Sequence, residues 1–280
     1  MSTPPRTTVD IKIHFDKNAA QYEKLTGGAT RRIAEACVQW LPPLSSSLRI
    51  LDSACGPGIV TRLILDRASE HGVVPPPNIT AIDFAPGMIS QLETHKSVLE
   101  WNTVEPRVLD AQRLEGIAND NFDAIVMNFG IFTLPDAELG AREMLRVLKS
   151  GGTAIVTTWK SSGLFDLLVR VVRAIRPEDE GRVFPVSKDW FTAEKVTNTM
   201  ISGGFQEAKI HLHVVRTTWQ NSSIEELVDA VSGPFWQRIW EDWTEEEKGR
   251  WRGEVEKQMT EKERSECSLD IVAWVCVAVK

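Results

Sequence analysis

The sequence predicts an α/β protein built on a doubly wound, mostly parallel β-sheet. Five short apolar runs between residues 48 and 159 alternate with amphipathic stretches of about ten to fifteen residues. Glycine or proline punctuates these segments, as is common where strands and helices meet. The runs are apolar almost throughout, which is typical of strands covered by helices on both faces. Strands that alternate with helices in this way pair in parallel, so we expect one such sheet with additions before and after it.

The residues before the first strand, 1–41, form a predicted amino-terminal helical cap. Residues 1–10 are rich in Thr and Pro, which predicts little regular structure, and a helical pattern runs over residues 11–40. Residues 26–28 interrupt that pattern, because paired glycines end a helix and allow a sharp turn.

The central segment, residues 42–160, contains the five predicted strands. They are expected at residues 48–54, 78–84, 103–111, 122–130 and 152–159. Helices are expected after the first, second and fourth of these strands, at residues 59–69, 86–100 and 136–150. Pro86 favours the first turn of the second helix, and Gly151 and Gly152 close the third.

In the remainder, residues 161–280, strands and helices no longer alternate regularly. This segment is predicted to complete the sheet and to carry helical insertions. Its expected helices are residues 164–176, with a wide apolar face, residues 189–205, and a charged, tryptophan-rich segment over residues 223–262. Its expected strands are residues 208–219 and 268–280.

Composition excludes several classes of function. The net charge of −7 repels phosphate backbones, so nucleic acid is not an expected partner. The four cysteines show no CxxC pair and no zinc spacing, which predicts reduced thiols and no metal. The amino terminus has no apolar core typical of a secretory signal, and the longest apolar run is far shorter than the ~20 residues that span a bilayer. We therefore expect a cytoplasmic protein without a membrane partner.

A glycine-rich turn follows the first strand and carries the strongest functional signal. The strand reaches Asp52, and Ala54, Gly56 and Gly58 lead into the next helix. Such a turn places free backbone N–H groups at the carboxyl edge of the sheet, where open α/β folds bind ligands. A dinucleotide-binding turn would have a third glycine where Thr61 stands, and the Asp52 carboxylate would repel a pyrophosphate. An acid here suits a cationic ligand, such as an ammonium or a sulfonium.

Two more acids follow the next two strands. Asp83 ends the second predicted strand and is suited to accept hydrogen bonds from a ribose diol. Asp110 ends the third, and Ala111 and Gln112 after it are placed to hydrogen-bond an adenine edge. The alternative role for these acids is helix capping and solvation.

Five motifs together resemble those of class I S-adenosylmethionine-dependent methyltransferases in order and spacing. They are "LDSACGPG", "AIDFAPGMI", "VLDAQRLE", "FDAIVMNFG" and "REMLRVLKSGG". The resemblance covers residues 15–159, and "FDKNAAQYEKL" is similar to the amino-terminal element of quinone-biosynthesis members. It implies a Rossmann-like, seven-stranded sheet, with S-adenosylmethionine as cofactor and S-adenosylhomocysteine as its product. Ala54 departs from the commonest pattern, which has glycine there.

The resemblance also implies roles for the cofactor-binding residues. Asp52 and the backbone of residues 54–58 would face the methionine part of the cofactor. Asp83 would bind the ribose hydroxyls, and Phe84 and Met88 would flank the adenine. Cys55, within the turn, would contribute its backbone and small size, because the nearest histidine in the sequence, His71, follows the next helix.

Further cofactor contacts are implied at the other strand ends and from the cap. Asp110 with Gln112 would read the adenine edge, and Asn128 with Phe129 would lie beside the transferable methyl group. Tyr22 would close over the cofactor from the amino-terminal helix. The resemblance identifies no catalytic residue, and the best candidate for a general base is His14, with a surface histidine as the alternative.

Aromatic residues predict an apolar acceptor site. The predicted substrate-contacting residues are Phe132, Trp159, Phe165 and Trp236. The helix over residues 164–175 would form a lid, and the rival role for its apolar face is packing. Trp240 and Trp243 follow Trp236 at helical spacing, which fits either a core or a pocket. His211 and His213 lie on one face of a strand, but no third ligand accompanies them, so a solvent-facing pair is expected.

The overall pattern resembles fungal secondary-metabolite methyltransferases. Within that group, the nearest resemblance is to the thiol S-methyltransferases that act on dithiol diketopiperazines of the gliotoxin type. O-methylation of a polyketide, phenol or quinone precursor is the alternative, and a non-catalytic, methyltransferase-like binding protein is a second. The expected partner is a small-molecule acceptor, and the expected state is a monomer or a weak homodimer.

Overall fold

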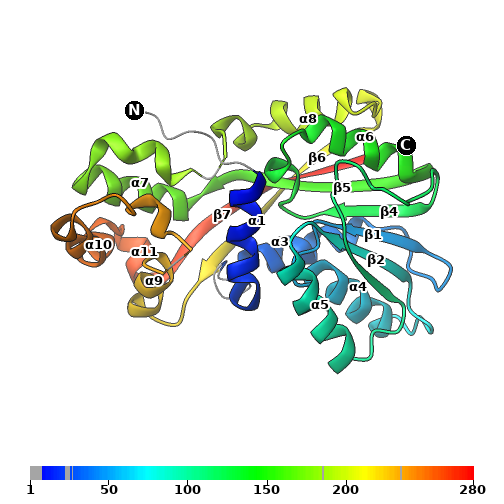
Figure 1. Ribbon diagram of the computed structural model, residues 1–280, viewed down its shortest axis with the longest axis horizontal. Helices are drawn as coiled ribbons and strands as arrows, with labels where there is room; N and C mark the ends of the chain where they lie inside the picture. The colour runs from blue at the N-terminus through cyan, green and yellow to red at the C-terminus, as the bar shows by residue number, and fades with distance from the viewer. Residues whose placement is uncertain (1–7, 23–25, 27, 185, 234) are drawn as a thin grey trace.

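The computed structural model describes residues 8–22, 26, 28–184, 186–233 and 235–280, and a seven-stranded sheet forms its centre (Figure 1). The strands lie in the order β3-β2-β1-β4-β5-β7-β6. They are β1 (Arg49–Ser53), β2 (Asn78–Asp83), β3 (Val104–Val108), β4 (Phe122–Met127), β5 (Leu148–Ser162), β6 (Ile210–Gln220) and β7 (Ser268–Val279). Neighbours from β3 to β5 pair in parallel, and β7 is antiparallel to both β5 and β6. The predicted doubly wound, mostly parallel sheet is confirmed.

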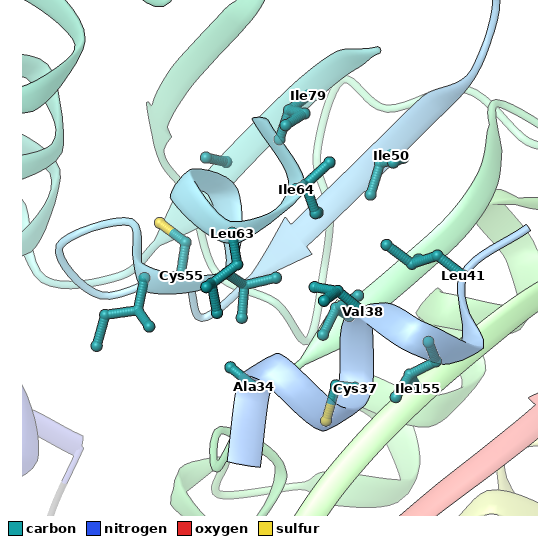
Figure 2. Close-up of a cluster of buried hydrophobic side chains, with 14 of the residues drawn as sticks. Ala34, Cys37, Val38, Leu41, Ile50, Cys55, Leu63, Ile64, Ile79 and Ile155 are labelled. Atoms are coloured by element: carbon teal, nitrogen blue, oxygen red, sulfur yellow. The ribbon is translucent and has the colours of Figure 1, made fainter. Parts of the chain in front are cut away.

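Strand β1 is the switch point of the sheet. It pairs with β2 on one side and with β4 on the other, so the chain winds outward from it in both directions. Ile50 is buried on one face, against Ile64 and Ile79, and Leu51 is buried on the opposite face. Figure 2 shows the first of these clusters between the sheet and the helices beside it. Ligands of such sheets bind beyond the carboxyl ends of the strands at the switch point.

Helices cover both faces of the parallel part of the sheet. They are α3 (Ala29–Cys37), α4 (Ile59–Glu70), α5 (Pro86–Val98), α6 (Ala137–Val147) and α8 (Ala193–Ser202). Helix α1 (Thr8–Asn18) precedes them and lies against α5 (Figure 1).

A second group of helices gathers beyond the end of the parallel sheet. We call it the helical lobe; it consists of α7 (Gly163–Ile175), α9 (Ile224–Val231), α10 (Glu245–Gln258), α11 (Glu261–Glu266) and the turns between them (Figure 1). The lobe has its own hydrophobic cluster, in which the ring centroids of Trp240 and Trp251 lie 4.0 Å apart. Trp240 and Trp243 are therefore core residues of the lobe and not part of the acceptor pocket, the two roles that their helical spacing allowed.

Several predicted boundaries are wrong. Residues 8–10 belong to α1, and β5 extends beyond residue 159, because it pairs with β7 as far as Ser162. The helix expected over residues 189–205 is a 3-10 turn followed by α8, since the Thr192 side chain accepts a hydrogen bond from the Lys195 amide and caps α8 there. The segment over residues 223–262 divides into α9, a 3-10 turn, α10 and the start of α11. Among the described residues, no helix has the length and apolar character to cross a membrane.

Candidate cofactor and acceptor site

The turn after β1 adopts a left-handed backbone at three positions. Ala54, Gly56 and Gly58 have φ values of 53°, 54° and 93°. A side chain on Gly58 would bring its Cβ within 3.1 Å of Leu92, so glycine is needed there for space as well as conformation. For Ala54 the left-handed conformation costs about 1–2 kcal/mol. Such strain concentrates at ligand sites and explains why glycine is commonest at that position.

Asp52 lies beneath this turn and is almost completely buried. Its Oδ2 accepts hydrogen bonds from the Thr61 amide at 2.9 Å and from the Thr61 hydroxyl at 2.7 Å. Its Oδ1 has no hydrogen-bond partner among the described residues. Burial raises the pKa of Asp52 to about 7, and the nearby Asp83 adds to the rise. Thr61, which stands where a dinucleotide-binding turn has its third glycine, thus donates hydrogen bonds to one oxygen of the Asp52 carboxylate. The other oxygen has no donor among the described residues.

Asp83 ends β2 beside the same turn. Its Oδ2 accepts a hydrogen bond from the Gly56 amide and its Oδ1 from the Ala85 amide, both at 2.9 Å. Burial raises the pKa of Asp83 to about 6. Met88, one turn into α5, is buried beside the turn, and a Cβ on Gly56 would lie 3.9 Å from its sulfur. Two buried acids therefore flank one glycine turn.

Asp110 lies two residues beyond β3, not at its end as predicted. Strand β3 stops at Val108 because its partner β2 ends at Asp83, the residue paired with it. In the turn that follows, the Gln112 amide donates a hydrogen bond to Asp110 Oδ1 at 2.9 Å. Gln112 Oε1 accepts another from the Asp136 amide, and Ala111 between them is buried. The two predicted adenine-edge residues are thus bonded to each other and to the start of α6.

The amino-terminal cap reaches the same edge of the sheet. The ring of Phe15 lies 6.2 Å from Tyr22 and 6.4 Å from Phe84, centroid to centroid. Asp16 Oδ1 accepts a hydrogen bond of 2.8 Å from the Gly87 amide in the first turn of α5. A Cβ on Gly87 would lie 3.0 Å from the Asp16 carbonyl, so only glycine admits the cap this closely. Phe15 and Asp16 open the quoted "FDKNAAQYEKL" motif but were not predicted as site residues.

Asn128 and Phe129 follow β4 and are held by an unpredicted residue, Thr157 of β5. The Phe129 amide donates a 2.8 Å hydrogen bond to the Thr157 hydroxyl, which donates a 2.9 Å bond to Asn128 Oδ1. Asn128 Nδ2 in turn donates to the Thr30 carbonyl at 3.1 Å. Phe129 has a φ of 56°, which is a strained conformation for a bulky residue. The hydrogen bonds thus hold a strained aromatic residue at the strand end.

A largely apolar chamber of about 130 Å³ opens beside Phe129. The predicted substrate-contacting residues all line it: Phe132, Trp159, Phe165 and Trp236. Tyr22 and Phe129, which were predicted to contact the cofactor, line it as well. The Trp159 ring stacks on Phe129, with centroids 3.8 Å apart and planes inclined by 23°. The structure therefore brings residues from the cap, the sheet edge and the helical lobe to one cavity.

The chamber also has lining residues that the sequence did not reveal. Thr30, Trp219 and Arg238 come from α3, β6 and a 3-10 turn of the lobe. No local pattern distinguishes them, because they come from three elements that are far apart in the sequence and meet only in the folded chain. The indole N–H groups of Trp219 and Trp236 have no hydrogen-bond partner among the described residues.

The other singled-out residues lie outside this chamber or outside the described structure. Cys55 is buried against the cluster of α4, beside Leu63 (Figure 2), and burial raises the pKa of its thiol well above the ordinary value. The position of His14 is in α1, but its side chain lies outside the described part of the structure. His213 stacks on Trp40, with ring centroids 4.6 Å apart.

Comparisons with known proteins identify the family of the chain. Residues 51–156 match the sequence profile of a methyltransferase domain. Methyltransferase ucsB of Acremonium sp is 30% identical over 204 residues, which cover 69% of this chain and 68% of that protein. Methyltransferase tpcH of Aspergillus fumigatus is 26% identical over 161 residues, 56% of this chain and 52% of that protein. The match therefore spans only about half of the second relative.

A solved structure shares the fold across the whole chain. It is phosphoethanolamine N-methyltransferase 2 of Haemonchus contortus, in complex with phosphomonomethylethanolamine and S-adenosylhomocysteine. The likeness has a TM-score of 0.58 at 16% identity and covers 100% of this chain and 60% of that one. Three observations lead to the same family: the fold, the glycine turn with its two buried acids, and the 30% identity to a named methyltransferase. The chain belongs to the class I S-adenosylmethionine-dependent methyltransferases.

Proposed function

We propose that this enzyme methylates a small hydrophobic acceptor bound in the chamber between the sheet edge and the helical lobe. The observation that carries the proposal is the stacked pair of Phe129 and Trp159, which links the carboxyl ends of β4 and β5 to an apolar cavity. Apolar cavities of this kind suit small molecules rather than macromolecules.

The residues around the glycine turn fit the cofactor. The Oδ1 of Asp52 has no hydrogen-bond partner among the described residues and is a buried acceptor that suits a cationic group. The glycines of the left-handed turn let a ligand approach the backbone closely beside it. We assign the methionine part to Asp52 and the turn, the ribose to Asp83, and the adenine to the surroundings of Phe84 and Met88. The further proposed contacts are Tyr22, Asp110, Ala111, Gln112 and Asn128. S-adenosylmethionine supplies a methyl group on a sulfonium, which becomes a neutral thioether after transfer.

The chain's own contribution is positioning and exclusion of water. Holding two reacting groups in line is worth roughly 7–11 kcal/mol of the barrier. Phe129 is fixed by its hydrogen bond to Thr157 and by the Trp159 ring, so the wall nearest the strand ends is rigid. Tyr22 also lines the chamber, and burial raises the pKa of its phenol to about 12, so the phenol stays protonated near neutral pH and does not act as a general base.

The lining favours a thiol as the methyl-accepting atom. Among the described lining residues there is no His, Asp, Glu, Lys or Cys side chain to act as a general base. A thiol has an ordinary pKa of about 8.5, so part of it is already the nucleophilic thiolate near neutral pH. Together with the resemblance to the gliotoxin-type enzymes, this supports a dithiol diketopiperazine as acceptor and two methyl transfers per molecule.

O-methylation of a phenol, polyketide or quinone precursor is the second candidate. Arg238 in the chamber wall favours it, because a nearby cation stabilises a phenolate. A non-catalytic protein that does not bind the cofactor would have no need of the strained turn or of an Asp52 oxygen that lacks a partner among the described residues.

The test is to incubate the enzyme with S-adenosylmethionine and a panel of small dithiols, phenols and amines, and to read product masses. Two added methyl groups on a reduced dithiol diketopiperazine, with none on phenols, would support the proposal. Methylation of phenols but no thiol would overturn the thiol assignment. Failure of the cofactor to bind would argue against any transfer by this chain.

A further inference from the structure

A serine at the junction of the sheet and the helical lobe lies in the chamber wall. Ser162, the last residue of β5, lines the chamber and is only 4% exposed. A register shift follows Trp159, and Ser162 pairs with Ile271, two residues away on β7 from the partner of Trp159. Residues two apart on a strand, and residues paired across two strands, point to the same face of a sheet. The shift therefore turns Ser162 to the face that carries Trp159 and the chamber.

The hydroxyl group of Ser162 takes no part in holding the fold. Ser162 stands at the N-cap position of α7, yet its side chain makes no capping hydrogen bond. No other hydrogen bond joins this hydroxyl to a residue that the structure describes. Ser223, at the same position of α9, does cap its helix, because its hydroxyl accepts a hydrogen bond of 3.1 Å from the Glu226 amide. Ser162 thus keeps a buried hydroxyl in the cavity wall that a ligand can use.

The first turn of α7 reaches the same cavity. Leu164 and Phe165, its second and third residues, line the chamber beside Ser162. The first N–H groups of a helix have no partner within the helix, and together they carry the positive end of the helix dipole. Among the described residues, no backbone carbonyl accepts a hydrogen bond from the amide of Leu164 or Phe165. The junction therefore offers the chamber hydrogen-bond donors and a partial positive charge.

We propose that Ser162 and the first turn of α7 bind the sulfur of the acceptor as a thiolate and so activate it without a general base. This inference rests on the proposed function, since it names how the same chamber prepares the acceptor. On binding, the S–H bond breaks, the proton passes to solvent, and the electron pair stays on sulfur as the nucleophile. Thiols at helix N-termini lose their protons more readily than free thiols, and O–H and N–H donors bind strongly to an anion. The rest of the acceptor stays uncharged, in keeping with the largely apolar lining.

Other ionisable groups near this junction are the same in every Ser162 variant. Tyr22 and Arg238 line the chamber, and Asp166 stands in the first turn of α7 on its exposed side. The Tyr22 phenol stays protonated near neutral pH, because burial raises its pKa to about 12. Arg238 donates a hydrogen bond of 3.2 Å to the carbonyl of Val183. A difference between Ser162 variants therefore reports on the Ser162 hydroxyl.

The test counts the protons released when the enzyme binds benzyl mercaptan, with benzyl alcohol as the matched probe that keeps its proton. A single ring suits the chamber of about 130 Å³, because a cavity of about 150 Å³ accepts benzene. Titration calorimetry at pH 7 without cofactor, repeated in buffers of different ionisation enthalpy, measures the release. A free thiol has a pKa of about 8.5 and is mostly protonated at this pH. We therefore expect most of one proton to be released with the mercaptan and none with the alcohol.

Ser162→Ala should at least halve the proton release and weaken mercaptan binding about tenfold, as for a lost hydrogen bond to a charged group. Alcohol binding should stay within about threefold of wild type, and Ser162→Thr, which keeps a hydroxyl group, should retain most of the release. The matched control is Ser223→Ala, because Ser223 caps α9 and is not among the described residues that line the chamber. This control should lower the melting temperature and leave the binding of both probes unchanged, whereas Ser162→Ala should melt as the wild type does.

Mercaptan binding without proton release by the wild type would overturn the proposal, as would binding of neither probe or an unchanged release in folded Ser162→Ala. The probe experiment needs no methyl transfer, so it separates this inference from the proposed function. Proton release without any methylated thiol in the acceptor panel would leave the thiolate site standing and count against the proposed function. Methylated thiols without proton release would do the reverse. If Ser162→Ala does not fold, the release by the wild type and by Ser162→Thr still decides the matter.

Discussion

At the scale of single residues, the site depends on buried polar groups that the protein alone does not fully satisfy. Asp52 has one oxygen bonded to Thr61 and one without a partner among the described residues. Burial raises the pKa of Asp52 to about 7 and that of Asp83 to about 6, compared with about 3.9 in an unfolded chain. Both acids thus bind protons at higher pH than in the unfolded chain, and a nearby cation would favour their ionised forms.

We predict that cofactor binding strengthens as the pH rises from 5 to 8. A cationic ligand favours the ionised acids, so binding releases protons, and well below the pKa values the dissociation constant should rise about tenfold per pH unit for each proton released. Calorimetry in buffers of different ionisation enthalpy measures the release. Asp52→Asn should weaken binding and flatten the upper part of the profile. An affinity independent of pH would refute the assignment.

The same acids predict how the free protein's stability changes with pH. Because their folded pKa values are raised, their contribution is fully present below about pH 4 and is lost as the pH rises through about 6 and 7. At pH 8 the buried charge is unfavourable, so Asp52→Asn should melt no lower than wild type. A clearly lower melting temperature for this variant would show that the Asp52 charge stabilises the fold.

Thr157 and Thr158 offer a matched pair of substitutions. Both are completely buried, but the Thr157 hydroxyl accepts from Phe129 and donates to Asn128, whereas the Thr158 hydroxyl has no partner among the described residues. Thr157→Val should lower the free energy of unfolding by about 1–3 kcal/mol, because a buried amide is left unpaired. Thr158→Val should be neutral or stabilising. Equal effects in urea denaturation would contradict this account.

At the scale of elements, the cap helix α1 lies close against α5 at Gly87. Asp16 accepts a hydrogen bond from the Gly87 amide, at the positive end of α5. Gly87→Ala would place a Cβ 3.0 Å from the Asp16 carbonyl, so α1 must move away. We expect cofactor to dissociate several-fold faster, measured by stopped-flow fluorescence.

The control for that prediction is a helical glycine with open space around it. Gly253 of α10 has no atom near its would-be Cβ, so Gly253→Ala should stabilise the helix by up to about 1 kcal/mol and leave cofactor kinetics unchanged. If Gly87→Ala behaved in the same way, the cap would have no part in holding the cofactor.

Elements with a strong local pattern were predictable, and those defined by distant pairing were not. The strand–turn–helix around Asp52 follows from apolar runs and glycines that are adjacent in the sequence. The extension of β5 to Ser162 depends on pairing with Ile271 of β7, more than a hundred residues away. Arg238 escaped notice for the same reason, since an isolated arginine in a charged segment has no distinguishing pattern.

At the scale of the whole molecule, the sheet and the helical lobe both contribute residues to the proposed site. The sheet presents the glycine turn and the stacked pair of Phe129 and Trp159. The lobe adds Phe165, Trp236 and Arg238, and the chamber lies between them. This division matches the chemistry, because the cofactor is common to the family whereas the acceptor differs among its members. We therefore expect lobe substitutions to change acceptor preference before they change cofactor affinity.

The most direct test is a crystal structure with S-adenosylhomocysteine, in which the position of the ligand's sulfur atom is measured. The account predicts the ribose beside Asp83, the amino group near Asp52, and the sulfur facing the chamber next to Phe129. A sulfur atom walled off from the chamber, or a ligand bound away from the turn after β1, would contradict it.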